Sequence, residues 1–181
     1  MPAFWLLLAA AGVPFHLQDT AGIWHDAAEW RGARAVVLFF VSIDCPISNS
    51  YAPEIQRISA TYSARGVRFY AVQPDPDRAP EDVKKYAADF GYTFPVLLDA
   101  RQELTRATGA TTMPQVVVLS ARGEVLYSGR VDDRYVAIGK SRDKPARYDL
   151  RDMLDALLAG KPVPRTKTKA VGCVIPAGPE Q

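Results

Sequence analysis

The chain has 181 residues, of which 48% are hydrophobic and 23% are charged. This length and composition predict one globular domain and exclude a disordered or fibrous protein. A net charge of +2 gives no general attraction for nucleic acid. Two cysteines and two histidines are too few for a disulfide framework or a histidine-rich metal centre. One structural disulfide, a redox-active pair and two separate thiols all stay possible.

The N-terminal segment FWLLLAAA, residues 4–11, is apolar and ends in small residues. Such a segment is typical of the end of a secretory signal peptide, and it is far too short to span a bilayer. We expect residues 1–12 to be a signal remnant, so that the protein is extracytoplasmic, periplasmic or secreted, with no stable membrane span. A packed first strand is the alternative.

Predicted strands and helices alternate along the rest of the chain. A hairpin is expected over residues 15–24. Continuous apolar or β-branched runs predict strands at 35–41, 67–72, 94–98, 115–119 and 125–127. Apolar residues at helical spacing predict helices at 47–66, 80–90, 100–108 and 150–158. The sequence therefore predicts one α/β domain over residues 13–160, followed by a basic tail, residues 161–181, without periodicity.

Cys45 lies where an apolar strand gives way to a helix, directly before Pro46, a residue suited to the first helical turn. Free amides and the helix dipole stabilise a thiolate at such a position. The adjacent Asp44 opposes that effect. We expect an activated but not extremely acidic thiol at Cys45, in preference to an inert buried cysteine.

These residues resemble a known family. The order strand, Cys-Pro-x-Ser, helix, with Pro53 eight residues after Cys45, is similar to thioredoxin. Thr112-Met113-Pro114, before the strand QVVVL, resembles the thioredoxin-fold loop whose cis-proline faces the active cysteine. The additional helix–strand–helix between residues 80 and 109 is similar to the redoxin, or AhpC/TSA-like, branch. The resemblance implies a thioredoxin-like fold: a central mixed sheet flanked by helices, with this insertion and a C-terminal tail.

The chain departs from both relevant patterns. Ser48 stands where a thioredoxin has its resolving cysteine, and Phe39 stands where it has a buried acid. A peroxiredoxin has Pro-x-x-x-Thr-x-x-Cys; here Ser42 matches the threonine, but Leu38 replaces the proline. The match to a peroxidase is therefore poor.

A second thiol must resolve the mixed disulfide of a thiol exchange reaction, and Ser48 cannot do so. Cys173 is a candidate, because the roughly thirteen residues after Gly160 can span about 40 Å. The radius of gyration of such a domain is only about 15 Å. Cys173 also lies in a small apolar stretch, AVGCVIP, within the polar tail. The alternative is a mobile tail whose Cys173 has no role, with the mixed disulfide at Cys45 resolved by an external thiol.

The sequence thus predicts a thiol–disulfide oxidoreductase with Cys45 as nucleophile, Cys173 as resolving thiol and Pro114 as the backbone element facing the substrate. Ser42, Ser48, Thr112 and Met113 are the expected substrate contacts. No bound cofactor or metal is implied, and the expected partners are thiol or disulfide proteins, including an electron donor. A thiol peroxidase and a copper-binding redox chaperone are the alternatives.

Two other features lie outside this set of site residues. Tyr51, in the first helical turns after Cys45, is expected to belong to the core. Asp132, Asp133 and Arg134 form a polar cluster, for which a solvated loop is the simplest interpretation.

Overall fold

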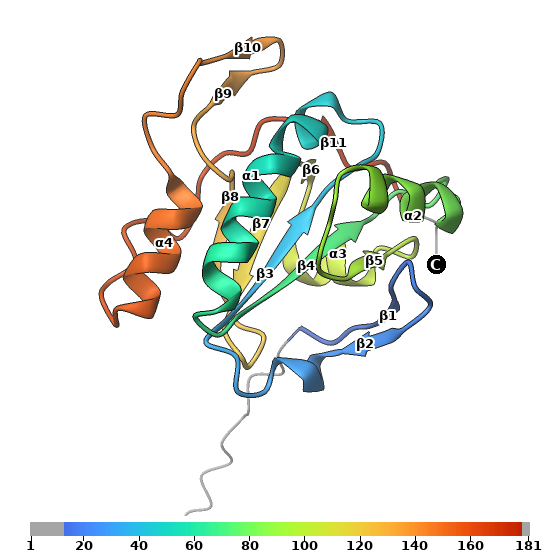
Figure 1. Ribbon diagram of the computed structural model, residues 1–181, viewed down its shortest axis with the longest axis horizontal. Coiled ribbons are helices and arrows are strands. Elements are labelled where there is room, and N and C mark those ends of the chain that lie inside the picture. Colours follow the sequence, from blue (N-terminus) through green and yellow to red (C-terminus); the bar gives the residue numbers. More distant parts are fainter. Residues whose placement is uncertain (1–12, 179–181) are drawn as a thin grey trace, which may run out of the picture.

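The computed structural model describes residues 13–178, so the expected signal remnant at residues 1–12 lies outside the described residues. A five-stranded sheet forms the centre of the molecule, in the order β5-β4-β3-β7-β8 (Figure 1). β4 runs parallel to both β3 and β5, whereas β7 runs antiparallel to β3 and β8. This confirms the predicted mixed sheet. Its strands are β3 (Ala35–Phe40), β4 (Val67–Gln73), β5 (Val96–Leu98), β7 (Gln115–Leu119) and β8 (Val125–Gly129).

Strand β3 lies in the middle of the sheet because both of its faces are apolar. All six residues of AVVLFF are buried. Ala35, Val37 and Phe39 belong to the core on one side of the sheet. Val36, Leu38 and Phe40 belong to the core on the other side. A strand covered on both faces fits the continuous apolar run from which it was predicted.

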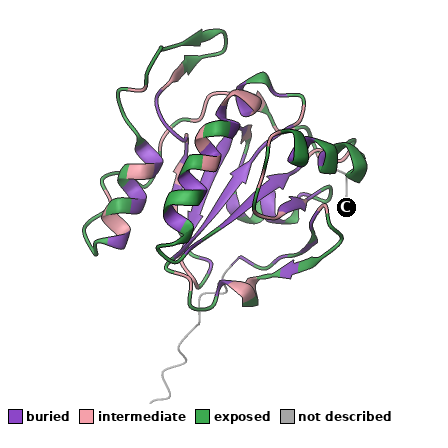
Figure 2. Ribbon diagram, in the orientation of Figure 1, coloured by how far each residue is buried: buried purple, intermediate pink, exposed green. Residues whose placement is uncertain are grey.

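Helices cover the two faces of the sheet unequally (Figures 1 and 2). Residues of α1 (Pro46–Ser63), α2 (Pro80–Asp89) and α4 (Asp149–Leu158) share one core with the sheet. The opposite core contains Leu104 of α3 (Glu103–Thr108) and Trp30 of the short 3-10 helix η1 (Ala27–Trp30). The four α-helices found within residues 13–178 were all predicted. Across residues 13–178, no helix has the length and apolar character that crossing a membrane requires.

Three two-stranded sheets stand outside the central one. β1 (His16–Gln18) and β2 (Trp24–Asp26) form the predicted N-terminal hairpin. β9 (Tyr135–Ala137) and β10 (Lys140–Ser141) form a projecting hairpin that was not predicted. β6 (Thr112–Met113) pairs antiparallel with β11 (Cys173–Val174) of the tail. The tail therefore contributes a strand to the fold.

The tail is attached to the domain along its length. The Ser128 amide donates a hydrogen bond of 3.0 Å to the Thr166 carbonyl, and the Thr168 amide donates one of 3.1 Å back to Ser128. A Cβ on Gly129 would lie 2.1 Å from the Thr168 hydroxyl, so only glycine permits this close approach. Beyond β11, the Gln102 side-chain amide donates to the Pro176 carbonyl at 2.8 Å. These contacts hold the tail against the domain, so that Cys173 lies near the start of α1.

Candidate active site

Cys45 occupies the N-cap position of α1, and Pro46 is the first helical residue. The predicted strand-to-helix position is therefore confirmed. The Asn49 amide donates to the Cys45 carbonyl at 3.0 Å, which begins the helical hydrogen bonding. Only 1% of Cys45 is exposed to solvent. Its thiol lies at the positive end of an 18-residue helix, where a thiolate is favoured.

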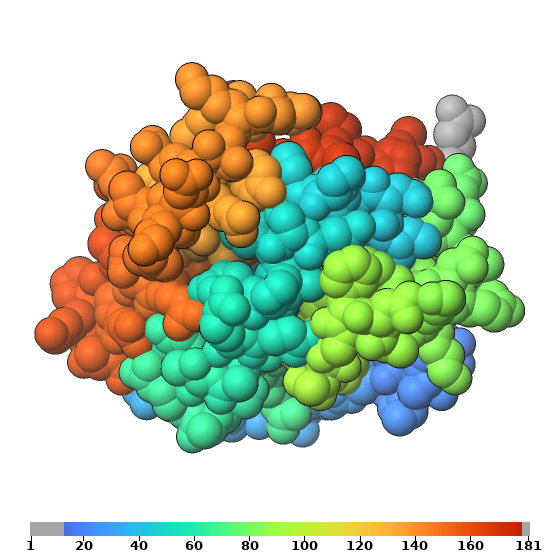
Figure 3. Space-filling model, turned by 45° about the horizontal axis from the view of Figure 1, so that its top comes forward, coloured from blue at the N-terminus to red at the C-terminus, as the bar shows by residue number. Residues whose placement is uncertain are grey.

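Cys173 lies directly beside Cys45, although 128 positions separate the two residues in the chain. The Cys173 Sγ lies 2.7 Å from the Cys45 Sγ, and no disulfide joins the two cysteines. Pairing of Cys173 with Met113, between β11 and β6, holds it there. The Cys45 Sγ also donates to the Met113 carbonyl at 3.1 Å. Figure 3 shows the tail lying against the segment that contains the start of α1.

The two thiols have opposite pKa shifts. Burial raises the pKa of Cys45, but hydrogen bonds from Cys173 and Ser48 outweigh it, so the pKa is lowered. Burial and the hydrogen bond to Cys45 raise the pKa of Cys173 to about 11. Cys45 is therefore the more acidic thiol of the pair, and the Cys173 thiol donates to its sulfur. Hydrogen bonds from Cys173 and Ser48 are the cause of this shift.

The loop before β7 is in the predicted conformation, since the Met113–Pro114 peptide bond is cis. Met113 is 2% exposed and Thr112 is partly exposed. Both residues pair with the tail: Met113 opposite Cys173, and Thr112 opposite Val174. A Cβ on Gly172 would lie 2.0 Å from the Met113 carbonyl oxygen. The backbone of the tail therefore lies against the loop on which we expected a substrate to bind.

The two serines expected to contact substrate lie inside the site. Ser48 is fully buried, and its hydroxyl accepts a hydrogen bond of 3.4 Å from the Ser42 amide. Ser42 is 4% exposed, and its hydroxyl accepts from the Asp44 amide at 3.3 Å. The Asp44 carboxylate points away to an ion pair with Arg78 at 3.0 Å. The serines connect the loop before α1 to its first turn.

A buried polar cluster near the same end of α1 corrects the expectation for residues 132–134. Asp132 and Asp133 are 4% and 6% exposed, so this segment is not a solvated loop. The Tyr51 hydroxyl donates to the Asp132 carboxylate, and burial raises the pKa of both groups. Asp133 accepts hydrogen bonds from two backbone amides of the segment before α4. The sequence could not show this, because the carboxylates find their partners on distant segments.

A family model described as Redoxin matches residues 2–140. The chain belongs to the Redoxin family. This family assignment agrees with the resemblance based on Cys45, Pro53 and Pro114. An uncharacterized conserved protein from Geobacillus kaustophilus has a solved structure with 29% sequence identity and a TM-score of 0.84. That comparison covers 100% of this chain and 99% of the other.

Other relatives in this comparison carry names that describe redox proteins. The thiol-disulfide oxidoreductase ResA of Geobacillus thermodenitrificans is 28% identical over 111 residues, which is 61% of this chain. A putative peroxiredoxin of Mycobacterium tuberculosis is 26% identical over 119 residues, covering 66% of this chain and 74% of that protein. The chain spans 62% of the length of the ResA protein. A putative thiol:disulfide interchange protein DsbE from Chlorobium tepidum is 25% identical, with a TM-score of 0.57 over 64% of this chain and 79% of that chain. These redoxin relatives confirm the predicted thioredoxin-like fold.

The site of this redoxin brings together the chemical groups that thiol–disulfide exchange requires. Cys45 supplies a thiol with a lowered pKa, and Cys173 supplies a second thiol 2.7 Å from it. Loss of two electrons and two protons from the pair would give a disulfide. No cluster of three or more potential metal-binding side chains occurs among residues 13–178.

Proposed function

We propose that this redoxin is a thiol–disulfide oxidoreductase that cycles between a Cys45–Cys173 dithiol and an intramolecular disulfide. The observation that carries the proposal is the 2.7 Å distance between the two sulfur atoms. Cys45 is the nucleophile that attacks a substrate disulfide. Cys173 then attacks the mixed disulfide and releases the reduced substrate. The thiol that Ser48 cannot supply therefore comes from the tail.

The same distance favours disulfide chemistry over copper binding by the two cysteines. A metal ion between two thiolates would hold the sulfurs about two metal–sulfur bonds apart, each about 2.3 Å in the case of zinc. The 2.7 Å between the two sulfurs is closer to the length of a disulfide bond, about 2.05 Å, than to that separation. We therefore prefer the redox pair to the copper-binding alternative.

The proposed partners are thiol or disulfide proteins, and the proposed location is outside the cytoplasm. A disulfide cycle of this kind suits an oxidising compartment, where structural and catalytic disulfides persist. The apolar segment at residues 4–11 supports the same location. Reduction of the Cys45–Cys173 disulfide would then come from an electron-donor thiol protein.

Reduction of a protein disulfide such as that of insulin, with dithiothreitol as electron source, tests this function. The wild-type protein should accelerate the reaction, Cys45→Ser should be inactive, and Cys173→Ser should accumulate a mixed disulfide at Cys45. Full activity of Cys45→Ser would contradict the proposal. Turnover of hydrogen peroxide without insulin reduction would replace it with the peroxidase alternative.

A further inference from the structure

The two cysteines of the pair differ in their exposure to solvent. Cys45 is 1% exposed, whereas Cys173 is partly exposed. The residue after Cys173, Val174, is 79% exposed. Cys173 therefore lies at the rim of the site, and Cys45 lies beneath it.

The tail itself covers Cys45. β11 occupies the open edge of β6, and the Ile175 amide donates to the Thr111 carbonyl at 3.0 Å to extend that pairing. Gly172 lies against the Met113 carbonyl, which in turn accepts the hydrogen bond from Cys45. A second peptide strand cannot pair with β6 while β11 is there. Access to Cys45 therefore requires the tail to leave, but access to Cys173 does not.

The access difference has a consequence for the reductive half of the cycle, and it rests on the proposed function. We infer that the incoming thiol reduces the disulfide by attacking the Sγ of Cys173, so that the tail, not Cys45, carries the mixed disulfide. Cys173 is thus the point of entry for electrons, in addition to its role in resolving the substrate complex.

The atoms and electrons of this route balance. The donor thiolate attacks Cys173 Sγ, the Cys45–Cys173 bond breaks, and Cys45 leaves as a thiolate with the bonding pair. A second donor thiolate then attacks the donor sulfur of the mixed disulfide, and Cys173 leaves and takes up a proton. The donor dithiol is oxidised to a disulfide, and the two protein cysteines are reduced. A dithiol protein is therefore the class of partner that completes the route.

The leaving-group chemistry agrees with the geometry. A thiol of lower pKa leaves faster in disulfide exchange. Hydrogen bonds from Ser48 act to lower the pKa of Cys45 and do not depend on the Cys173 thiol, whereas burial raises the pKa of Cys173. Expulsion of Cys45 is therefore favoured over expulsion of Cys173.

Mapping the first adduct of a small thiol tests the inference on the full-length protein. The oxidised protein is mixed with cysteamine, quenched with acid at early times and digested, and the cysteamine adduct is located by mass spectrometry. We expect about tenfold or more adduct on Cys173 relative to Cys45, because both access and leaving group favour that sulfur. The same oxidised protein unfolded in urea is the control, and there the preference should largely disappear.

Two different failures remain distinguishable. An equal distribution, or an excess of adduct on Cys45, in the folded protein would overturn the inference and leave the disulfide cycle intact. If the oxidised protein still contains two titratable thiols before cysteamine is added, the proposed function itself fails, and the inference fails with it.

Discussion

At the scale of single residues, hydrogen bonds from two segments set the reactivity of Cys45. Phe39 stands where a thioredoxin has a buried acid, and Asp44 is paired with Arg78. The helix start at Pro46 was visible in the sequence, and the expectation of an activated Cys45 rested on it. The hydrogen bond that the Cys173 thiol donates to Cys45 was not visible in the sequence, because 128 positions separate the two residues.

Removing the donor on Cys173 should raise the pKa of Cys45. We expect a higher pKa in Cys173→Ala than in Cys173→Ser, since the serine hydroxyl can still donate to the thiolate. Each variant has a single cysteine, so the ultraviolet absorbance of the thiolate, followed as a function of pH, gives the pKa of Cys45 in each. The same titration curve in both would show that Cys173 does not stabilise the Cys45 thiolate.

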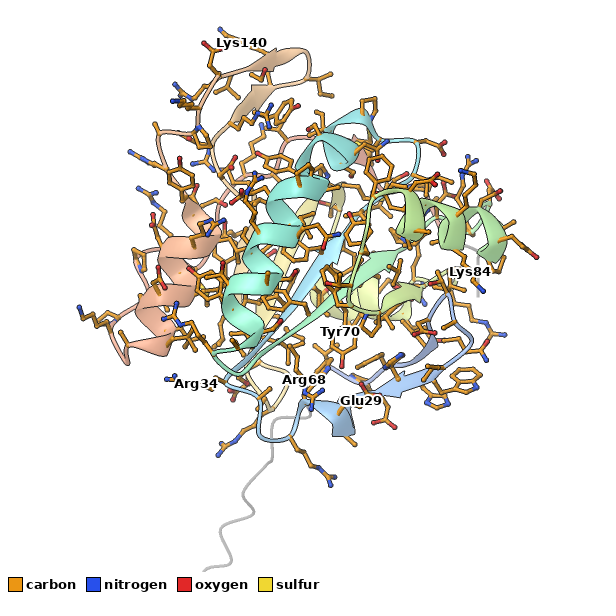
Figure 4. The ribbon with its side chains drawn as sticks, in the orientation of Figure 1. Glu29, Arg34, Arg68, Tyr70, Lys84 and Lys140 are labelled. Carbon is orange, nitrogen blue, oxygen red and sulfur yellow. The ribbon has the colours of Figure 1, made fainter. Side chains whose placement is uncertain are left out.

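A second residue-scale prediction concerns His25, which anchors the N-terminal hairpin. Its ring lies 3.1 Å from the Asp19 carboxylate and 3.0 Å from Glu29. Tyr70 of β4 donates to the same Glu29 at 2.8 Å; Glu29 and Tyr70 are labelled in Figure 4. Burial lowers the pKa of His25, but the two carboxylates outweigh it, and the pKa is raised.

A raised pKa in the folded state gives stability that is fully present below the unfolded pKa, about 6.5. That stability is lost as the pH rises through the higher folded pKa of His25. The free energy of unfolding should therefore fall over this pH window in the wild-type protein, and His25→Gln should remove the slope. His16→Gln is the matched control, because His16 is exposed and has no ion pair among residues 13–178. A slope that persists in His25→Gln would rule out this assignment.

At the scale of elements, the tail strand β11 is the part of the site that sequence patterns did not reveal. A two-residue strand has no periodicity, and its position depends on contacts with β6 and β8. The same reason explains why the hairpin β9–β10 was missed; Lys140 marks its outer end in Figure 4. In contrast, the strands of the central sheet and the α-helices have enough residues for a hydrophobic pattern to emerge.

Lifting β11 from β6 should expose Cys45. A Cβ at Gly172 would lie 2.0 Å from a backbone oxygen that cannot move aside cheaply, so Gly172→Ala should weaken the docking of the tail. Overpacking of this kind typically costs about 1–3 kcal/mol. Each 1.4 kcal/mol lost from docking makes the open state about tenfold more populated. Alkylation of Cys45 in the reduced protein should therefore accelerate by about fivefold to a hundredfold.

The control for this prediction is Val174→Ala, in the same strand, where the side chain is 79% exposed and the backbone pairing is kept. Its alkylation rate at Cys45 should match that of the wild-type protein. Peptide mapping of the alkylated cysteine gives both rates. Equal rates for Gly172→Ala and Val174→Ala would show that β11 does not limit access to Cys45.

At the scale of the whole molecule, the α/β class, the mixed sheet and the cis-proline loop followed from the sequence and its resemblance to redoxins. These features depend on long apolar runs and on local motifs around Cys45 and Pro114. The path of the tail depends on non-local contacts instead, such as the close approach of Thr168 to Gly129. Chain length showed that Cys173 can reach Cys45, but only the structure shows the two side by side.

Oxidation should stabilise the whole fold. A Cys45–Cys173 disulfide would close a loop of 129 residues, counting both cysteines. Loop entropy gives a stabilisation of about 4–5 kcal/mol for this span, as an upper value because docking already restrains the tail. Denaturant unfolding of the oxidised and reduced proteins measures the difference. Oxidation should not raise the free energy of unfolding of Cys173→Ser. An equal rise in that variant would show that the Cys45–Cys173 disulfide is not the cause.

The central claim is that Cys45 and Cys173 form a reversible intramolecular disulfide. Intact mass and thiol titration of the monomer, before and after mild oxidation and again after reduction, test it most directly. We predict the loss of both thiols and two hydrogen atoms, a cross-linked peptide that joins Cys45 to Cys173, and full recovery on reduction. Two thiols that remain titratable in the oxidised monomer, or a disulfide found only between two copies of the chain, would contradict the claim.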